Sequence, residues 1–194
     1  MTTVLQLYGL DYTRYRQHLL KLDQTSRYMR FGFNISDEGI NKLCDEIETH
    51  INMHKIFIIE NSDLEVIAAG HIALDQNDWQ KMELAFSVLE PYRNHGYASK
   101  LMERCLEWCR NRNITAGFMV CLSNNTVMKH LAEKHGIDMY NEEGEVMAEI
   151  RLPIGNGMTY MRELIETNLA TMDHLGKSNA YTARKFIFNR FTNA

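Results

Sequence analysis

The sequence has little proline and only moderate glycine, with 2 prolines and 11 glycines in 194 residues. No stretch is rich in either residue, which argues against linkers and low-complexity segments. No apolar run approaches the ~18 residues that a membrane-spanning helix requires, and no basic segment followed by an apolar one opens the chain. We therefore expect a chain that is folded throughout and has no membrane partner.

An excess of charge of one sign is absent as well, because the formal net charge is -4. Such a chain has no long-range field to attract a nucleic-acid backbone, so no nucleic-acid partner is expected. The cysteines form neither a CxxC pair nor a metal-ligand spacing, and are expected to be buried free thiols in a reducing cytoplasm: Cys44, Cys105, Cys109 and Cys121. His50 and His54 lie one helical turn apart without an acidic or cysteine partner, so we expect no metal.

Alternating and helical spacings of apolar residues predict an α/β (α+β) domain with one sheet. The expected strands are residues 4–8, 55–60, 66–74, 82–89, 115–122, 137–140 and 146–152. Helices are expected at residues 12–22, 36–51 and 98–111 and between Asn125 and Gly136. Residues 23–33 show no clear period and are expected to form a loop that packs its aromatic side chains inward.

The central motif is the passage from the strand that starts at Met82 to the helix that ends at Asn111. The apolar run stops at Pro91, a short polar loop with Gly96 follows, and helical spacing begins at Ala98. A junction of this kind presents unpaired backbone N–H groups and the positive end of a helix dipole. It predicts a site for an anion such as a phosphate or a pyrophosphate.

Two motifs resemble those of the GNAT superfamily of acyl-CoA-dependent N-acyltransferases. The first is Arg93-Asn94-His95-Gly96-Tyr97-Ala98, which follows the lead Val88-Leu89-Glu90-Pro91-Tyr92 and matches the family's acyl-CoA loop. The second, residues 125–137, is similar to the family's asparagine-led helix. The resemblance covers residues 4–152. It implies a mixed, mostly antiparallel central sheet with helices on both faces, and a single acyl-CoA N-acyltransferase domain over residues 1–152.

By this resemblance, the anion is the pyrophosphate of acetyl-CoA, the co-substrate. The residues that it implies for acetyl-CoA binding are Val88, Arg93, Asn94, His95, Gly96, Tyr97, Ala98, Ser99 and Asn125. Each backbone N–H from Asn94 to Ser99 can donate a charge-assisted hydrogen bond worth roughly 1.5–3 kcal/mol. The resemblance also implies a bulge where the entering strand splays from the next one, with the pantetheine arm bound along residues 86–90. A plain N-cap remains an equal interpretation of Asn125, and a solvated side chain is favoured for Lys100.

Catalysis by direct attack needs a neutral amine, and an amine with a pKa near 10.4 is neutral in about one molecule in a thousand near pH 7.4. A general base is therefore useful, and Glu83 stands where many family members carry a glutamate in that role. The alternative is a solvent-facing glutamate of the sheet. The family often protonates the departing thiolate with a tyrosine, but that position here is Ala132. Tyr140, His135 and Ser123 could stand in for the tyrosine, but a structural role is favoured for each.

The expected function is transfer of an acetyl group from acetyl-CoA to a primary amine of a small molecule or peptide. A non-catalytic acyl-CoA sensor or scaffold is the alternative, motivated by Ala132 and by the tail. Arg27 and Arg30 suit an acceptor with a carboxylate or phosphate, or anchor their loop. Residues 153–194 are expected to form a C-terminal extension of two helices, 158–175 and 179–191, packed on the core or used for dimerisation. Its aromatic and basic residues suit a cap over the acceptor site or a homodimer contact: Tyr160, Tyr181, Arg184, Lys185 and Phe186.

Overall fold

The computed structural model describes residues 2–142 and 145–192. Its centre is a seven-stranded sheet with the strand order β1-β2-β3-β4-β5-β7-β6. Neighbouring strands are antiparallel except for β4 and β5, which run parallel. The strands are β1 (Leu5–Gln6), β2 (His54–Glu60), β3 (Val66–Leu74), β4 (Lys81–Val88), β5 (Ala116–Leu122), β6 (Asp138–Glu142) and β7 (Glu145–Arg151). The predicted meander and closing hairpin are confirmed.

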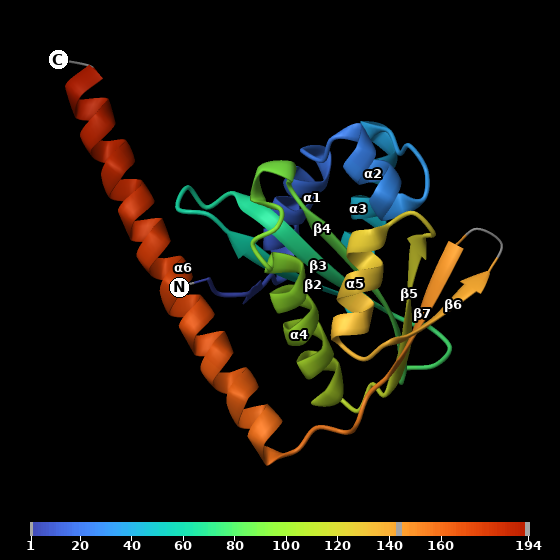
Figure 1. Cartoon of the computed structure of the whole chain (residues 1–194). Helices are drawn as coiled ribbons and strands as arrows, with labels where there is room; N and C mark the ends of the chain where they lie inside the picture. The colour runs from blue at the N-terminus through green and yellow to red at the C-terminus, as the bar shows by residue number, and fades with distance from the viewer. Residues whose placement is uncertain (1, 143–144, 193–194) are drawn as a thin grey trace.

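Helices cover both faces of this sheet (Figure 1). The helices α1 (Tyr12–Leu20), α2 (Gln24–Phe31) and α3 (Asp37–Thr49) lie on one face, and α4 (Tyr97–Arg110) and α5 (Thr126–Lys134) lie on the other. Strand β2 shows why two cores form. Ile56 and Ile58 pack toward α1 and α3, whereas Phe57 and Ile59 pack toward α4, because successive strand residues point to opposite faces. This arrangement confirms the expected mixed sheet between two helical layers.

The prediction of a loop at residues 23–33 is wrong for the central part of this segment, which forms helix α2. Asp23 caps the helix by accepting a hydrogen bond from the N–H of Ser26 at 2.9 Å, and Gly32 ends it with φ of 78°. The helix has only two turns and buries little of its own surface, so its apolar period is too short to detect. The capping residues were the available signal, because Asp at an N-cap and Gly after the last turn are typical of helix ends.

The C-terminal extension is one helix, α6 (Gly157–Thr192), and not the two that were predicted. A glycine inside a helix costs only about 1 kcal/mol, and contacts on both sides of Gly176 keep the helix continuous. His174 lies 2.9 Å from a carboxylate oxygen of Glu60, and Lys177 pairs with Asp173 at 2.6 Å. Helix α6 runs beside α4, and its C-terminal part extends past the rest of the molecule (Figure 1).

Two general expectations can be compared with the described residues. All four cysteines are buried and free, as predicted. Among helices in the described part of the chain, none combines the length and the apolar character that crossing a membrane would demand.

Candidate active site

Strands β4 and β5 separate in the middle of the sheet. They pair only from Lys81 with Ala116 to Glu83 with Phe118. Beyond this point β4 follows β3 as far as Val88, and β5 follows β7. The predicted splay is therefore present. The predicted bulge is not, because the β3–β4 register in the described strands is unbroken. The edge of β4 that faces the opening keeps backbone groups available to an extended ligand.

The opening leads to the loop between β4 and α4. A 3-10 turn at Glu90–Tyr92 is followed by two residues with left-handed backbone, Asn94 at φ of 63° and Gly96 at φ of 75°. No side chain caps the first turn of α4. The N–H groups of this turn are therefore open to an external acceptor, and the helix dipole adds positive potential there. The loop therefore has the backbone geometry that its sequence indicated, and anion binding there stays a prediction.

A narrow cleft of about 220 Å³ lies between the end of α2 and the two diverging strands. Its walls come from three segments: Met29–Gly32, Glu83–Ala85 and Val120–Leu122. Glu83 is exposed and stands at the point where β4 and β5 part. Arg30 provides the other charged side chain among the lining residues. The cleft thus joins one carboxylate, one guanidinium and the opening in the sheet.

Comparisons with known proteins identify the family of this chain. The sequence profile of the acetyltransferase (GNAT) family matches residues 19–137, which is more than half of the chain. The chain belongs to the GNAT family. Its class of activity is acyl-CoA-dependent N-acetyl transfer, with acetyl-CoA as the co-substrate. No curated protein sequence matches the chain.

Several solved structures share the GNAT fold. The GNAT domain of S. lividans PAT aligns with a TM-score of 0.65 at 20% identity, over 78% of this chain and 90% of that one. RimL, a ribosomal L7/L12 α-N-protein acetyltransferase in complex with CoA, has a TM-score of 0.62 at 12% identity, over 80% and 97%. Spermidine N-acetyltransferase from Vibrio cholerae, in complex with CoA and spermine, has a TM-score of 0.58 at 15% identity, over 77% and 93%.

The side chain of Arg93, the first residue of the GNAT loop motif, points to α2. Its Nη2 donates a hydrogen bond to Oγ of Ser26 at 2.5 Å and lies 3.6 Å from Oδ2 of Asp23. Asp23 also has a lowered pKa, chiefly because its carboxylate accepts a hydrogen bond from Ser26. In this arrangement Arg93 ties the loop to the N-terminus of α2. The structure therefore connects the loop between β4 and α4 to the helix that forms one wall of the cleft.

Ser99, in the first turn of α4, is joined to the end of α5. Its Oγ accepts a hydrogen bond from Nζ of Lys134 at 2.7 Å and lies 3.1 Å from Nε2 of His135. Lys134 was not among the predicted site residues, because only the fold places the end of α5 beside this turn. Burial lowers the pKa of His135, which favours its neutral form. Lys134 adds positive charge beside the loop, whereas Lys100 points away and reaches the carbonyl oxygen of Thr2 at 3.5 Å.

The remaining predicted residues occupy distinct places. Oδ1 of Asn125 accepts the N–H of Met128 at 3.1 Å, so the N-cap interpretation is confirmed, and a contact with the pantetheine arm stays a prediction. His95 lies over the loop, with Nδ1 2.7 Å from the carbonyl oxygen of Arg93 and its ring stacked on Tyr97. Ala98, in the first turn of α4, packs against the core, as does Val88 at the end of β4.

The two arginines near the cleft have different roles. Arg27 donates hydrogen bonds to the carbonyl oxygens of Leu20 and Leu22 and pairs with Asp37 at 2.7 Å. These contacts make Arg27 an anchor for the segment around α2, which was one of the two interpretations left open. Arg30 alone of the two lines the cleft.

Proposed function

We propose that this GNAT protein transfers an acetyl group from acetyl-CoA to a primary amine of a small molecule or a peptide, by direct attack of the amine on the thioester carbonyl. The observation that carries the proposal is the opening between β4 and β5. It connects the uncapped N-terminus of α4, where a pyrophosphate fits, with the cleft that contains Glu83. An acetyl group held in the opening would meet an amine in the cleft.

Binding of acetyl-CoA would rest mainly on backbone groups. The N–H groups from Asn94 to Ser99 would hold the pyrophosphate, and the backbone from Phe86 to Glu90, at the end of β4 and the start of the following turn, would pair with the amides of the pantetheine arm. Lys134 would add charge beside the phosphates, because Ser99 holds its ammonium group at the first turn of α4. Backbone donors of this kind are rigid and therefore need little reorganisation when the anion arrives.

Glu83 is the base that we propose. The amine loses a proton to its carboxylate, directly or through a water molecule. The neutral amine nitrogen then forms a bond to the acetyl carbon, the carbon–sulfur bond breaks so that the thiolate of CoA leaves, and the second proton of the nitrogen passes to water or to the thiolate. The register of the sheet identifies two further carboxylates in the same row, since Glu83 pairs with Phe118, Phe118 pairs with Glu149, and Glu149 pairs with Asp138 on the outer strand β6. These residues share a face of the sheet. Glu149, however, is occupied by Arg151 at 2.9 Å.

The cleft favours an acceptor with a slender amine-bearing end. Its volume of about 220 Å³ is below the ~300–1,000 Å³ that is usual for pockets that enclose a whole drug-sized ligand. Spermidine and ribosomal proteins are the acceptors named for related structures. Arg30 in the wall would repel a polyamine and would pair with a carboxylate or phosphate. We therefore propose an acceptor with an acidic group near its amine, as in an amino acid or an acidic peptide terminus.

The departing thiolate has no assigned acid in this proposal. Ala132 is buried in the core, and His135 is bound to Ser99 with a lowered pKa. Val120 lines the cleft, and Tyr140 on β6 is separated from it by one intervening strand. The Cα atoms of these two residues are therefore roughly 10 Å apart. A thiol with a pKa near 8.5 is a tolerable leaving group, and water can protonate the thiolate. Acid catalysis is therefore not required for turnover.

The test is CoA release from acetyl-CoA across a panel of amino acids, peptides and polyamines. Glu83→Gln should lower kcat by roughly 10²-fold or more and leave the affinity for CoA unchanged in calorimetry. Glu149→Gln is the matched control, because it neutralises a carboxylate in the same row of the sheet, and it should retain activity. Equal losses of CoA binding in both variants, or loss of turnover only in Glu149→Gln, would contradict the role of Glu83. CoA binding without acceptor-dependent release would instead support the sensor or scaffold function.

A further inference from the structure

Helix α6 exposes an apolar stripe on the side that faces away from the protein. Its members recur at intervals of three, four or seven residues and are from 39% to 82% exposed: Met158, Met161, Leu164, Ile165, Leu169, Met172 and Leu175. We call these seven residues the outer stripe. The least exposed of them, Leu169, lies at the edge of the stripe, where it also lines a cavity beside α4. Residues at such intervals lie on one side of a helix, and Met158, Met161, Ile165, Met172 and Leu175 occupy positions a and d of successive heptads.

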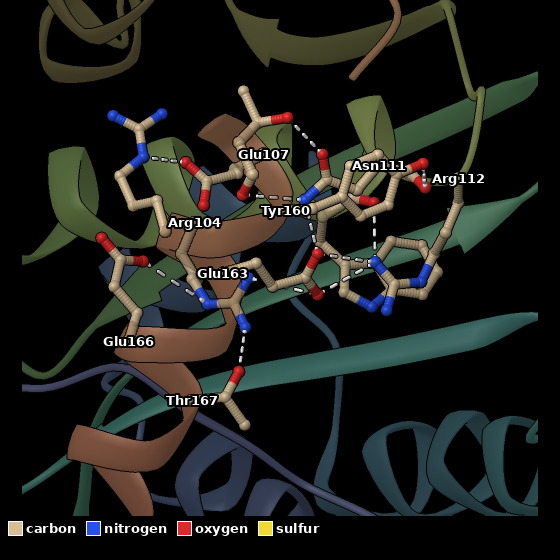
Figure 2. Close-up of polar contacts among 11 residues, drawn as sticks. Arg104, Glu107, Asn111, Arg112, Tyr160, Glu163, Glu166 and Thr167 are labelled. Carbon is tan, nitrogen blue, oxygen red and sulfur yellow. Dashed lines mark hydrogen bonds and ion pairs between the residues drawn. The ribbon is translucent and has the colours of Figure 1, made fainter. Parts of the chain in front are cut away.

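The side of α6 that faces the protein is polar instead. Figure 2 shows Arg104 of α4 among residues of α6, with hydrogen-bond or ion-pair distances of 2.9 Å to Thr167, 3.6 Å to Glu163 and 3.7 Å to Glu166. Glu163 also accepts a hydrogen bond from Asn111 at 2.6 Å. Farther along, His174 meets Glu60, and Arg184 meets Asp63 at 3.1 Å. Ala170 is the one hydrophobic residue of α6 that is buried in the described structure.

This polarity is the reverse of that of an ordinary surface helix, which turns its apolar stripe to the core. The face of α4 that α6 contacts is likewise of the surface type, since it presents Arg104, Glu107 and Asn111 (Figure 2). The apolar face of α4 is buried against the sheet, where Leu101 and Cys105 are fully covered. The packing of α6 within one chain therefore leaves its apolar face without a partner.

The exposed area is large enough for a stable interface. The exposed fractions of the seven side chains together equal about four whole residues, which is on the order of 700 Å² of mostly apolar surface per chain. A typical monomer has a largest patch of ~300–600 Å², and a stable complex buries about 800 Å² per partner. The outer stripe alone comes close to the latter value.

The charges of the helix segment that carries the stripe favour a second copy of this chain over an anionic membrane. Residues 157–179 contain two basic residues, Arg162 and Lys177, and three acidic ones, Glu163, Glu166 and Asp173. Helices that lie on anionic lipid carry an excess of basic residues on their polar face. A heptad seam, in contrast, is self-complementary, and Asn168, at a d position, is the single polar residue among the a and d positions of this one.

We propose that α6 is a dimerisation helix, in which the outer stripe packs against the same stripe of a second copy. The proposed acetyl-CoA site lies at the opening between β4 and β5 and includes no residue of α6. This assembly is therefore independent of the acetyl transfer proposed above. Loss of one would leave the other intact.

The test is the molar mass of the full chain in solution, measured by light scattering and sedimentation equilibrium over a series of concentrations. The wild type should be a dimer. Ile165→Asp and Met172→Asp should each weaken the dimer by ~100-fold or more, because each places a charge in the seam. The matched control is Leu10→Asp, which changes a 93% exposed leucine outside α6 and should leave the dimer unchanged.

Circular dichroism should show unchanged helix content in all three variants, since the replaced side chains are largely exposed. A monomeric wild type would overturn the proposal, and so would a dimer that both stripe variants retain. A monomer that binds anionic phosphatidylserine vesicles and loses this binding in Ile165→Asp would identify the stripe as a lipid-binding surface and would equally overturn it.

Discussion

Burial of His18 should make the stability of the protein depend on pH. The imidazole is 1% exposed, with Nδ1 2.9 Å from the carbonyl oxygen of Val66 and Nε2 2.8 Å from Oγ of Ser87. Burial lowers the pKa of His18 to about 4 against the opposing effect of Val66, and the charges of Arg30 and Lys21 lower it further. In the unfolded chain the pKa returns to about 6.5. The folded protein therefore holds His18 neutral over a range in which the unfolded chain protonates it.

The sign and size of the effect follow from proton linkage. Between pH 6.5 and about 4 the unfolded chain binds more protons than the folded protein, so the free energy of unfolding falls as the pH falls. From about pH 7.5 to about pH 5, the expected loss from His18 is about 2 kcal/mol. His71 and His54 also have pKa values lowered chiefly by burial and should add to the loss in the same direction.

Urea unfolding at these two pH values measures the effect in the wild type, His18→Gln and His130→Gln. Glutamine does not titrate, so the pH-dependent loss in His18→Gln should be smaller than in the wild type by about 2 kcal/mol. His130 is exposed on α5, and its replacement should keep the wild-type loss. The comparison is between pH values within each variant, which removes the cost of repacking the site. An unchanged loss in His18→Gln would refute the reasoning.

Two further predictions concern the acetyl-CoA loop and the contact between α4 and α6. Gly96→Val should reduce CoA affinity by ~10-fold or more in calorimetry, because φ of 75° is strained for a β-branched residue; unchanged affinity would contradict a role for the backbone shape. Glu163→Ala should lower the free energy of unfolding in urea by ~2–4 kcal/mol, because it removes an ion-pair partner of the buried Arg104. The control Glu149→Ala breaks an exposed pair, and a loss as large there would show that the burial of Arg104 is not the cause.

Features set by neighbouring residues could be predicted from the sequence. The turn at Pro91, the left-handed Gly96 and the start of α4 follow one another within a few residues, so the motif indicates both the anion site and its place after a strand. Ser36 similarly predicted the start of α3, where its Oγ accepts the N–H of Gly39. The apolar period failed to indicate α2, which has only two turns and packs on β4 and β5, so its capping residues Asp23 and Gly32 were the local signal that remained.

Distant contacts could not be predicted in the same way. Ser26 and Arg93 are 67 residues apart, and Ser99 and Lys134 are 35 apart, yet each pair is hydrogen-bonded. The strand order also places β7 between β5 and β6, although β5 and β6 are consecutive in the chain. Such pairings depend on how the whole sheet and its helices pack together. No short stretch of the sequence indicates this packing.

The sequence by itself determined the family, the order of the strands as far as β4 and the backbone shape of the loop between β4 and α4, because these depend on local backbone preferences and on a short motif. The apolar residues of α6 are equally plain in the sequence, but their meaning is not. Only the tertiary structure decided that the polar side of α6 meets α4 and that the apolar side faces outward. The physical reason is that a helix packs with the side whose residues can bond to its neighbours. Here the neighbouring side chains are polar, and they bond to polar residues of α6: Arg104, Glu107 and Asn111.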